Sequence, residues 1–215
     1  MPFTAKSGKF NASINAVEFG TGDKAVKIGG ENVFPLYSFD AAIENAPKVG
    51  IEITDFGMEH EPECIKKYYE GCATLADMAR KAASMEGVDF LSFRMEGGDP
   101  NGANKSTEEL IGELKEIADA VDLPLVVCGC KNVEKDAELF SKAAEALNGK
   151  NAVILSAKEE NYKTVGAAAG LAYKQVVGAE SAVDINLAKQ LNVLISQLGV
   201  DSKSVVMNVG TAAVG

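Results

Sequence analysis

Residues 106–128 read STEELIGELKEIADAVDLPLVVC, an amphipathic stretch that leads directly into a short apolar run. Ser106 and Glu109, three residues apart, form the pattern of a capping box, which predicts a helix from there to about residue 121. Pro124 marks the connection that follows, because the residue before a proline is biased away from helical geometry. The run Leu125–Cys128 then has the length and β-branched content of a buried strand. Helix and strand thus alternate within one short segment.

The same alternation extends along the chain from residue 48 onward. Asp184 is placed to cap the last helix, and Gly149 and Gly199 fall where a left-handed C-cap residue belongs. Strand and helix alternate about six times without a break in composition, which predicts a parallel sheet covered by helices. The expected strands are Val49–Ile53, Val88–Phe93, Leu125–Cys128, Ala152–Leu155, Gln175–Val177 and Ser204–Met207, and the expected helices cover about 63–86, 106–121, 133–148, 161–173 and 184–199.

Two α/β architectures fit this pattern, a closed (β/α)8 TIM barrel and an open doubly wound sheet. A dinucleotide-binding open sheet should carry a glycine-rich fingerprint after its first strand, but Thr54-Asp55-Phe56-Gly57 follows instead, and no Walker-type loop occurs. We therefore favour the barrel. Because a barrel needs eight strands and about six are counted, we expect residues 48–215 to be a TIM-barrel domain whose C-terminal part is missing.

Residues 1–47 form a separate N-terminal extension. Val26–Ile28 and Val33–Tyr37 flank Gly29-Gly30-Glu31-Asn32, which predicts a β-hairpin. Such a hairpin could plug the bottom of a barrel, so we assign this extension a structural role.

Composition excludes several classes of function. Of 215 residues, 47% are hydrophobic and 24% charged, with a net charge of −10, which is typical of a globular protein and unlike a disordered one. An acidic chain with only two arginines, Arg80 and Arg94, is a poor candidate for binding nucleic acid or an anionic membrane. No apolar run is long enough to span a membrane, and the N-terminus lacks a signal-peptide pattern, so we expect a cytoplasmic protein.

The cysteines and the single histidine do not form a metal-site pattern. Cys128-Gly129-Cys130 lacks the spacing of a zinc ribbon or of a ferredoxin cluster, and Cys64 and Cys72 are irregularly placed. His60 has no second histidine to complete a zinc triad. We expect reduced, mostly buried thiols and no metal bound by this chain.

In a barrel, functional side chains lie at the carboxyl ends of the strands. Arg94 is placed there to bind a carboxylate or an amide-rich ligand, and a salt bridge to Asp55 or Glu96 is the equally good alternative. Lys158 could be a Schiff-base lysine, although its neighbours favour a solvated side chain. No convincing catalytic set appears. Amides, hydroxyls and thiols at this edge suit a large neutral cofactor or a partner better than acid–base catalysis.

Four stretches carry a resemblance to a known family. The chain resembles the small (delta) subunit of the corrinoid iron–sulfur protein, a component of the acetyl-CoA decarbonylase/synthase complex. The last of the four, with its capped helix, is the most specific. They are residues 29–40 (GGENVFPLYSFD), 122–125 (DLPL), 161–164 (NYKT) and 183–192 (VDINLAKQLN).

The resemblance implies a (β/α)8 barrel in a heterodimer with a large (gamma) subunit. That partner would carry the [4Fe–4S] cluster, and a corrinoid (cobalamin) would lie between its corrinoid domain and the top of this barrel. The implied role is non-catalytic methyl carriage in the Wood–Ljungdahl pathway. A separate methyltransferase would supply the methyl group from methyltetrahydrofolate or methyltetrahydropterin, and acetyl-CoA synthase/CO dehydrogenase would receive it.

The expected cofactor-binding residues are the polar loop groups Arg94, Asn132, Asn161 and Asn208. No motif of the family fixes them, and residues 207–210 (MNVG) differ from the acidic–proline version of other members. Two alternatives stay open. The chain could be a methyltetrahydrofolate-dependent methyltransferase that grips the pterin with Asp55, Asn132 and Asn208, or it could be a scaffold subunit without cofactor contact.

Overall fold

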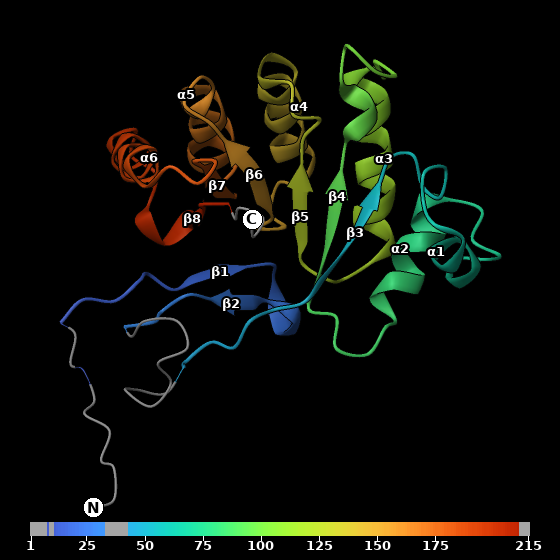
Figure 1. The fold of residues 1–215 in the computed structure, drawn as a ribbon, viewed down its shortest axis with the longest axis horizontal. Helices are drawn as coiled ribbons and strands as arrows, with labels where there is room; N and C mark the ends of the chain where they lie inside the picture. The colour runs from blue at the N-terminus through green and yellow to red at the C-terminus, as the bar shows by residue number, and fades with distance from the viewer. Residues whose placement is uncertain (1–7, 9–10, 33–42, 211–215) are drawn as a thin grey trace, which may run out of the picture.

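A computed structural model of the chain describes residues 8, 11–32 and 43–210. Six parallel strands form one sheet, and their order in the sheet is their order in the sequence (Figure 1). All six expected strands are therefore confirmed. The strands are β3 (Gly50–Thr54), β4 (Phe90–Arg94), β5 (Leu125–Cys128), β6 (Val153–Ala157), β7 (Val176–Glu180) and β8 (Val205–Asn208).

This strand order decides between the two architectures. A doubly wound sheet reverses its strand order at a switch point, whereas here each strand pairs with its successor and the order never reverses. The open doubly wound alternative is therefore excluded. The sequential order is that of a barrel wall, but β3 and β8 are the two edges of the sheet and pair with no further strand among the described residues. A closed barrel is not seen.

The helices follow the strands as the sequence predicts, with two differences. The expected helix over 63–86 is two helices, because the chain turns at Gly71 (φ 88°) and Thr74 starts a new helix with a reciprocal capping box to Asp77. The expected helix over 161–173 is α-helical only at its start and continues as a π-helix over Gly166–Ala172. The α-helices are α1 (Glu63–Tyr68), α2 (Leu75–Ala83), α3 (Thr107–Ala120), α4 (Val133–Ala146), α5 (Tyr162–Val165) and α6 (Ile185–Gln197).

The capping residues behave largely as expected. The Ser106 side chain accepts a hydrogen bond from the backbone N–H of Glu109, and the Asp184 side chain accepts from the N–H groups of Asn186 and Leu187. Gly149 and Gly199 have the positive φ angles of left-handed C-cap residues. Each side-chain cap satisfies N–H groups that the helix itself leaves without partners.

The two faces of the sheet have separate cores. Alternate strand residues such as Val127 and Ile154 pack under the helices in the main core, while their neighbours Val126 and Val153 belong to a smaller cluster on the opposite face. Figure 1 shows the helices gathered on one side of the strands and the N-terminal hairpin on the other. This period-two division is what a pleated strand buried on both faces requires.

The N-terminal hairpin lies against that second face. β1 (Val17–Phe19) pairs antiparallel with β2 (Val26–Ile28), with Gly22–Lys24 as a short 3-10 turn between them. The strand that pairs with β2 therefore comes before it in the sequence, whereas the expected second arm, Val33–Tyr37, lies outside the described residues. Phe19 packs edge-on against Phe90, the first residue of β4, with ring centroids 5.7 Å apart. The hairpin thus covers this second face near the amino ends of the strands.

No helix in the described part of the chain is long and apolar enough to cross a membrane.

Candidate functional site

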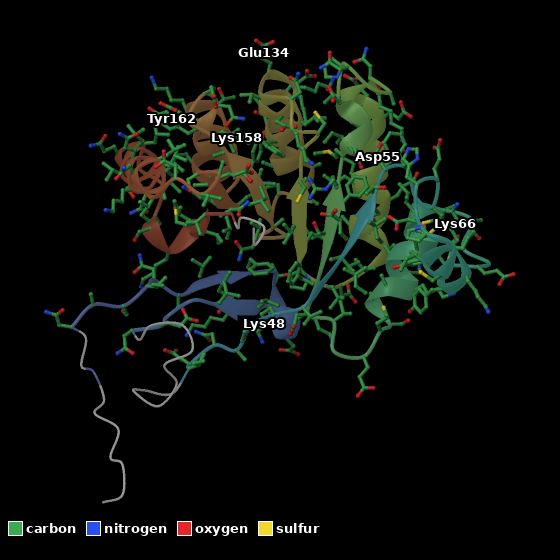
Figure 2. All side chains as sticks on the ribbon, viewed as in Figure 1. Lys48, Asp55, Lys66, Glu134, Lys158 and Tyr162 are labelled. Atoms are coloured by element: carbon green, nitrogen blue, oxygen red, sulfur yellow. The ribbon has the colours of Figure 1, made fainter. Side chains whose placement is uncertain are left out.

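A polar pocket of about 260 Å³ opens at the carboxyl ends of the strands, on the face that the helices do not cover. It collects the last residues of β4 to β8 and the loops that follow them. In Figure 2, Lys158 lies near the carboxyl ends of the strands, whereas Lys48, which precedes β3, lies near their amino ends. The lining residues are Arg94, Cys128, Gly129, Lys131, Asp136, Leu155, Ser156, Lys158, Glu180 and Asn208.

Arg94 reaches this pocket from the end of β4 and is held by Glu52 of β3. Its Nε donates to Oε1 of Glu52 at 2.9 Å, and its Nη2 donates to Oε2 at 2.8 Å. This fork raises the pKa of Arg94, so the guanidinium stays charged. The alternative of a salt bridge from Arg94 to Asp55 or Glu96 is wrong, because Arg94 pairs with Glu52, and Asp55 binds Lys105 and the backbone N–H of Gly97.

Glu52 is a residue that the sequence reasoning missed. It could have been found from the alternation of side chains between the two faces of paired strands. The register places Glu52 opposite Ser92 and Thr54 opposite Arg94, so Glu52 shares a face with Arg94 and points away from buried Ile53. A glutamate inside an otherwise apolar strand is the kind of residue that this pattern singles out.

A second carboxylate, Glu180 at the end of β7, has a similar environment across the pocket. Its Oε2 accepts a hydrogen bond from the Ser156 hydroxyl at 2.8 Å, and its Oε1 lies 3.6 Å from Nζ of Lys158. The Lys158 side chain is 27% exposed. It is therefore neither the fully solvated lysine that its neighbours favoured nor a lysine sealed in an apolar pocket, and its ion pair is unlike the setting of a Schiff-base nucleophile.

The thiol of Cys128 lines the pocket between these two groups. Its Sγ lies 3.5 Å from the Ser92 hydroxyl, and burial raises the pKa of the thiol, which therefore stays protonated at neutral pH. All four cysteines are free, as expected. Cys128 and Cys130 are buried, whereas Cys64 is exposed and Cys72 is half-buried, so the expectation of mostly buried thiols holds for only two of the four.

The turn after β5 is fixed by one buried carboxylate, Asp136 of α4. It accepts hydrogen bonds from the backbone N–H groups of Cys130 (2.7 Å) and Lys131 (3.1 Å), and the Cys130 thiol lies 3.2 Å away. Burial raises the pKa of Cys130 to about 11, which keeps that thiol neutral. A side chain at Gly129 would collide with the Asp136 carboxylate, so the close approach requires glycine there.

The four expected cofactor-binding residues divide into two pairs. Arg94 and Asn208 both line the pocket, and the Oδ1 of Asn208 accepts from the N–H of Gly210 at 3.2 Å. Asn132 is instead the N-cap of α4, where it accepts from the N–H of Lys135. Asn161 is 4% exposed and holds the loop after β6 by accepting from the N–H of Lys158 at 2.7 Å. Neither Asn132 nor Asn161 lines the pocket.

Beside the pocket, a buried ion cluster fixes the loops after β3 and β4. Asp55 has a fully buried side chain that accepts from Gly97 N and pairs with Lys105 at 3.0 Å. Lys105 also donates to Glu113 of α3 at 3.2 Å, and these two partners raise its pKa although burial alone would lower it. Figure 2 labels Asp55 at the carboxyl end of β3.

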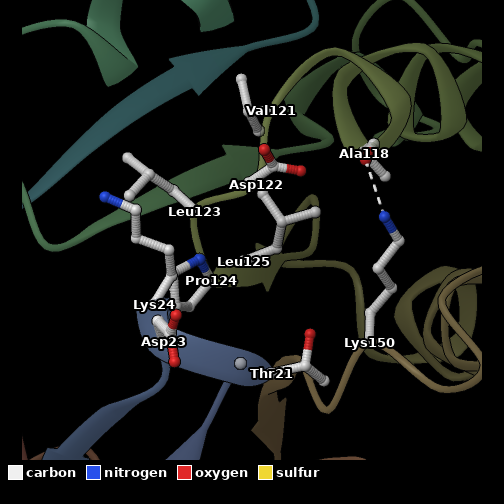
Figure 3. Close-up of a pocket in the computed structure, with 11 residues that line it drawn as sticks. Thr21, Asp23, Lys24, Ala118, Val121, Asp122, Leu123, Pro124, Leu125 and Lys150 are labelled. Carbon is white, nitrogen blue, oxygen red and sulfur yellow. Dashed lines mark hydrogen bonds between the residues drawn. The ribbon is translucent and has the colours of Figure 1, made fainter.

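A second hollow, of about 270 Å³, lies at the opposite end of the sheet, where the hairpin turn meets the α3–β5 connection (Figure 3). Lys150 lies along one side of it and donates to the carbonyl of Ala118 at 3.0 Å (Figure 3). The hairpin is tied in nearby, because Gly20 N donates to Asn151 O and the Asn151 amide donates back to Gly20 O. The residues around this hollow connect the hairpin to the sheet.

The charges around the polar pocket are balanced. Three basic side chains line it, Arg94, Lys131 and Lys158, and two acidic ones, Asp136 and Glu180. Glu52 neutralises Arg94 from the side. No cluster of three or more possible metal ligands occurs within the described residues. The arrangement suits binding of a polar, uncharged group.

Comparison with known proteins assigns the chain to a family. A profile of the CO dehydrogenase/acetyl-CoA synthase delta subunit family matches residues 16–215. The chain belongs to this family. The resemblance found in the sequence is thereby confirmed.

The relatives are archaeal proteins that are named acetyl-CoA decarbonylase/synthase complex subunit delta. That of Methanothermobacter thermautotrophicus is 31% identical over 209 residues, which cover 96% of this chain and 53% of the relative. That of Methanocaldococcus jannaschii is 31% identical over 215 residues, with 96% and 52% covered. That of Archaeoglobus fulgidus is 31% identical over 201 residues, with 91% and 44% covered. The chain thus spans about half the length of the relatives it matches.

Proposed function

We propose that this chain is the wall of a (β/α)8 barrel, residues 48–215, that holds one side of a corrinoid in a methyl-carrying heterodimer. The observation that carries the proposal is the polar pocket at the carboxyl ends of β4 to β8, the edge at which barrels bind their ligands. Membership in the delta-subunit family, whose relatives are named as subunits of a complex, supports assembly with further subunits. The proposed partner is the large (gamma) subunit with its [4Fe–4S] cluster.

The residues of the pocket fit a corrinoid. A corrin ring is rimmed with neutral amide side chains, which both donate and accept hydrogen bonds. The pocket offers both kinds of group and has no excess of one charge, with Arg94 paired to Glu52 and Lys158 to Glu180. When bound, the cobalt of the corrinoid would supply the nucleophile that accepts a methyl group and the site that carries it.

The contribution of this chain would be to position and to shield. The pairs Arg94–Glu52 and Glu180–Ser156 hold their polar atoms in fixed places before any ligand arrives, which lowers the cost of ordering them on binding. The neutral Cys128 thiol in the lining adds no charge that would draw water in. The methyl donor would be methyltetrahydrofolate or methyltetrahydropterin on a separate methyltransferase, and the acceptor acetyl-CoA synthase/CO dehydrogenase.

Co-purification with the large subunit under anaerobic conditions tests this function. We expect a heterodimer whose ultraviolet–visible spectrum has both corrinoid and iron–sulfur bands, while this chain by itself is colourless. A chain that binds no partner but binds methyltetrahydrofolate would contradict the proposal and favour a methyltransferase.

A further inference from the structure

We propose that the polar pocket at the carboxyl ends of β4 to β8 is a site for a single primary carboxamide group and selects it against a carboxylate. The inference deepens the proposed function, because the amide would be one side chain of the corrin ring. It concerns the chemistry of the pocket itself, however, and can hold or fail independently of which molecule carries the amide.

Size is the first argument. The pocket holds about 260 Å³, which is slightly less than the usual range of about 300–1,000 Å³ for sites that enclose a whole small molecule. A cofactor of corrin size does not fit inside it. A side group of a few non-hydrogen atoms does, while the rest of the ligand lies outside.

The second argument is that several polar atoms of the pocket make no hydrogen bond to other described residues. Arg94 uses Nε and Nη2 on Glu52, and its Nη1 has no hydrogen-bond partner in the described part of the chain. Among the described residues, Asn208 makes its one side-chain hydrogen bond through the carbonyl oxygen, which leaves Nδ2 as a donor. Glu180 receives one short hydrogen bond, from Ser156, and the partner of its Oε1 within the described ranges is the Lys158 ammonium at 3.6 Å. Within the described part of the chain, the pocket therefore offers unused donors on Arg94 and Asn208 and one carboxylate oxygen, Oε1 of Glu180, that accepts no hydrogen bond.

A primary carboxamide matches this set because its NH2 group donates and its oxygen accepts. The NH2 group would donate to Glu180, and the oxygen would accept from Lys158 or Asn208. A carboxylate in the same place has no hydrogen to donate. Its oxygen would face the Glu180 carboxylate, and the two negative charges would repel each other. A site that is built for a specific donor rejects analogues that lack it, since its own polar group is then left unpaired.

Two probes test the site, propionamide and propionate, which differ only in the amide. Each is titrated into the 15N-labelled chain of residues 1–215, and the backbone signals of Lys158, Glu180 and Asn208 are followed. We expect propionamide to shift these signals with an initial slope at least about five times that of propionate. Equal slopes, a larger slope for propionate, or shifts spread evenly over the surface would overturn the inference.

Variants separate the role of Glu180 from general folding. In Glu180→Gln the side chain can donate to a carboxylate, so the ratio of the two slopes is expected to fall to about one. The exposed neighbour Glu159 gives the matched control, and Glu159→Gln should keep the preference of the wild-type chain. A preserved preference in Glu180→Gln, with a well-dispersed spectrum, would contradict the assignment of Glu180.

A parallel experiment distinguishes this inference from the proposed function. The heterodimer is offered cobinamide and a cobinamide monocarboxylate in which one side-chain amide has been hydrolysed. If the heterodimer retains cobinamide but the chain shows no preference for propionamide, the carboxamide site is contradicted and the proposed function is not. Preference for propionamide without retention of any corrinoid would support the carboxamide site and contradict the proposed function.

Discussion

Arg94 of β4 and Glu52 of β3 lie diagonally across neighbouring strands, joined by two hydrogen bonds of 2.9 and 2.8 Å. The pair lies where the sheet meets the polar pocket, with 28% of the arginine side chain and 43% of the glutamate side chain exposed. Its geometry is the bidentate fork that gives a guanidinium–carboxylate contact both strength and direction. Arg94 is thereby fixed before any ligand binds.

Coupling between these two residues is measurable. In a double-mutant cycle of Arg94→Met and Glu52→Gln, we expect an interaction free energy of about 0.5–1.5 kcal/mol, since partly exposed ion pairs contribute little more than about 1 kcal/mol. Urea unfolding of the four proteins gives the value. Strictly additive effects would mean that the fork does not persist in solution.

A methyl group at Gly129 should disrupt the turn after β5. Gly129→Ala would drive a Cβ atom into the Asp136 carboxylate, which holds the N–H groups of Cys130 and Lys131. We expect a loss of about 1–3 kcal/mol in unfolding free energy. The matched control is Gly112→Ala in the exposed part of α3, where nothing lies within 4 Å, and a gain of about 0.5–1 kcal/mol is expected. The same sign for both substitutions would refute this account of Gly129.

Gln175 joins α4, the loop before β7 and the start of β6 from a fully buried position. Its oxygen accepts from Ala152 N at 2.6 Å, and its NH2 group donates to the carbonyls of Leu147 (3.0 Å) and Tyr173 (3.2 Å). Gln175→Leu keeps the volume but leaves these groups without partners, so we expect a loss of about 2–4 kcal/mol. Gln190→Leu on the exposed side of α6 should change stability by about 0.5 kcal/mol or less. Thermal unfolding that fails to rank the two variants in this order would exclude the role given to Gln175.

Glu113 should make stability depend on pH. Burial raises the pKa of Glu113 above its ordinary value of 4.5, so the folded chain binds more protons than the unfolded chain between these two values. The contribution of Glu113 to stability is therefore present at low pH and is lost as pH rises through the folded pKa. Relative to the wild-type chain, Glu113→Gln is expected to gain stability as pH rises from below 4.5. Urea midpoints from pH 3.5 to 7 measure this, and a difference (Glu113→Gln minus wild type) that stays constant or falls as pH rises would count against it.

Most of the fold can be predicted from short sequence patterns. Strand positions followed from short apolar runs such as Leu125–Cys128, and helix starts followed from caps such as Ser106 and Asp184, because both signals are written within a few residues. The break of the expected helix over 63–86 was missed although Gly71 and Thr74 lie inside it. The amphipathic pattern of α2 starts only after that turn, so an interpretation of the whole stretch as one helix hides the turn.

The site was less predictable, because its contacts join residues that are far apart in the sequence. Arg94 and Asn208 were picked as groups at strand ends and do line one pocket, but Glu52 and the Ser156–Glu180 contact depend on strand register. Asn132 and Asn161 were picked by the same reasoning and serve as loop and helix caps. Position at a strand end does not tell whether an asparagine turns toward the pocket or toward its own backbone.

The most direct test of the central claim compares two ends of the sheet in the anaerobic heterodimer. Arg94→Glu reverses a charge at the polar pocket, and Lys24→Glu does the same in the hollow at the opposite end, on an exposed residue. We expect Arg94→Glu to reduce the corrinoid absorbance per heterodimer by at least about ten-fold, with the iron–sulfur bands unchanged, and Lys24→Glu to retain the full absorbance. Equal corrinoid content in the two variants would contradict a corrinoid held at the carboxyl edge of this sheet.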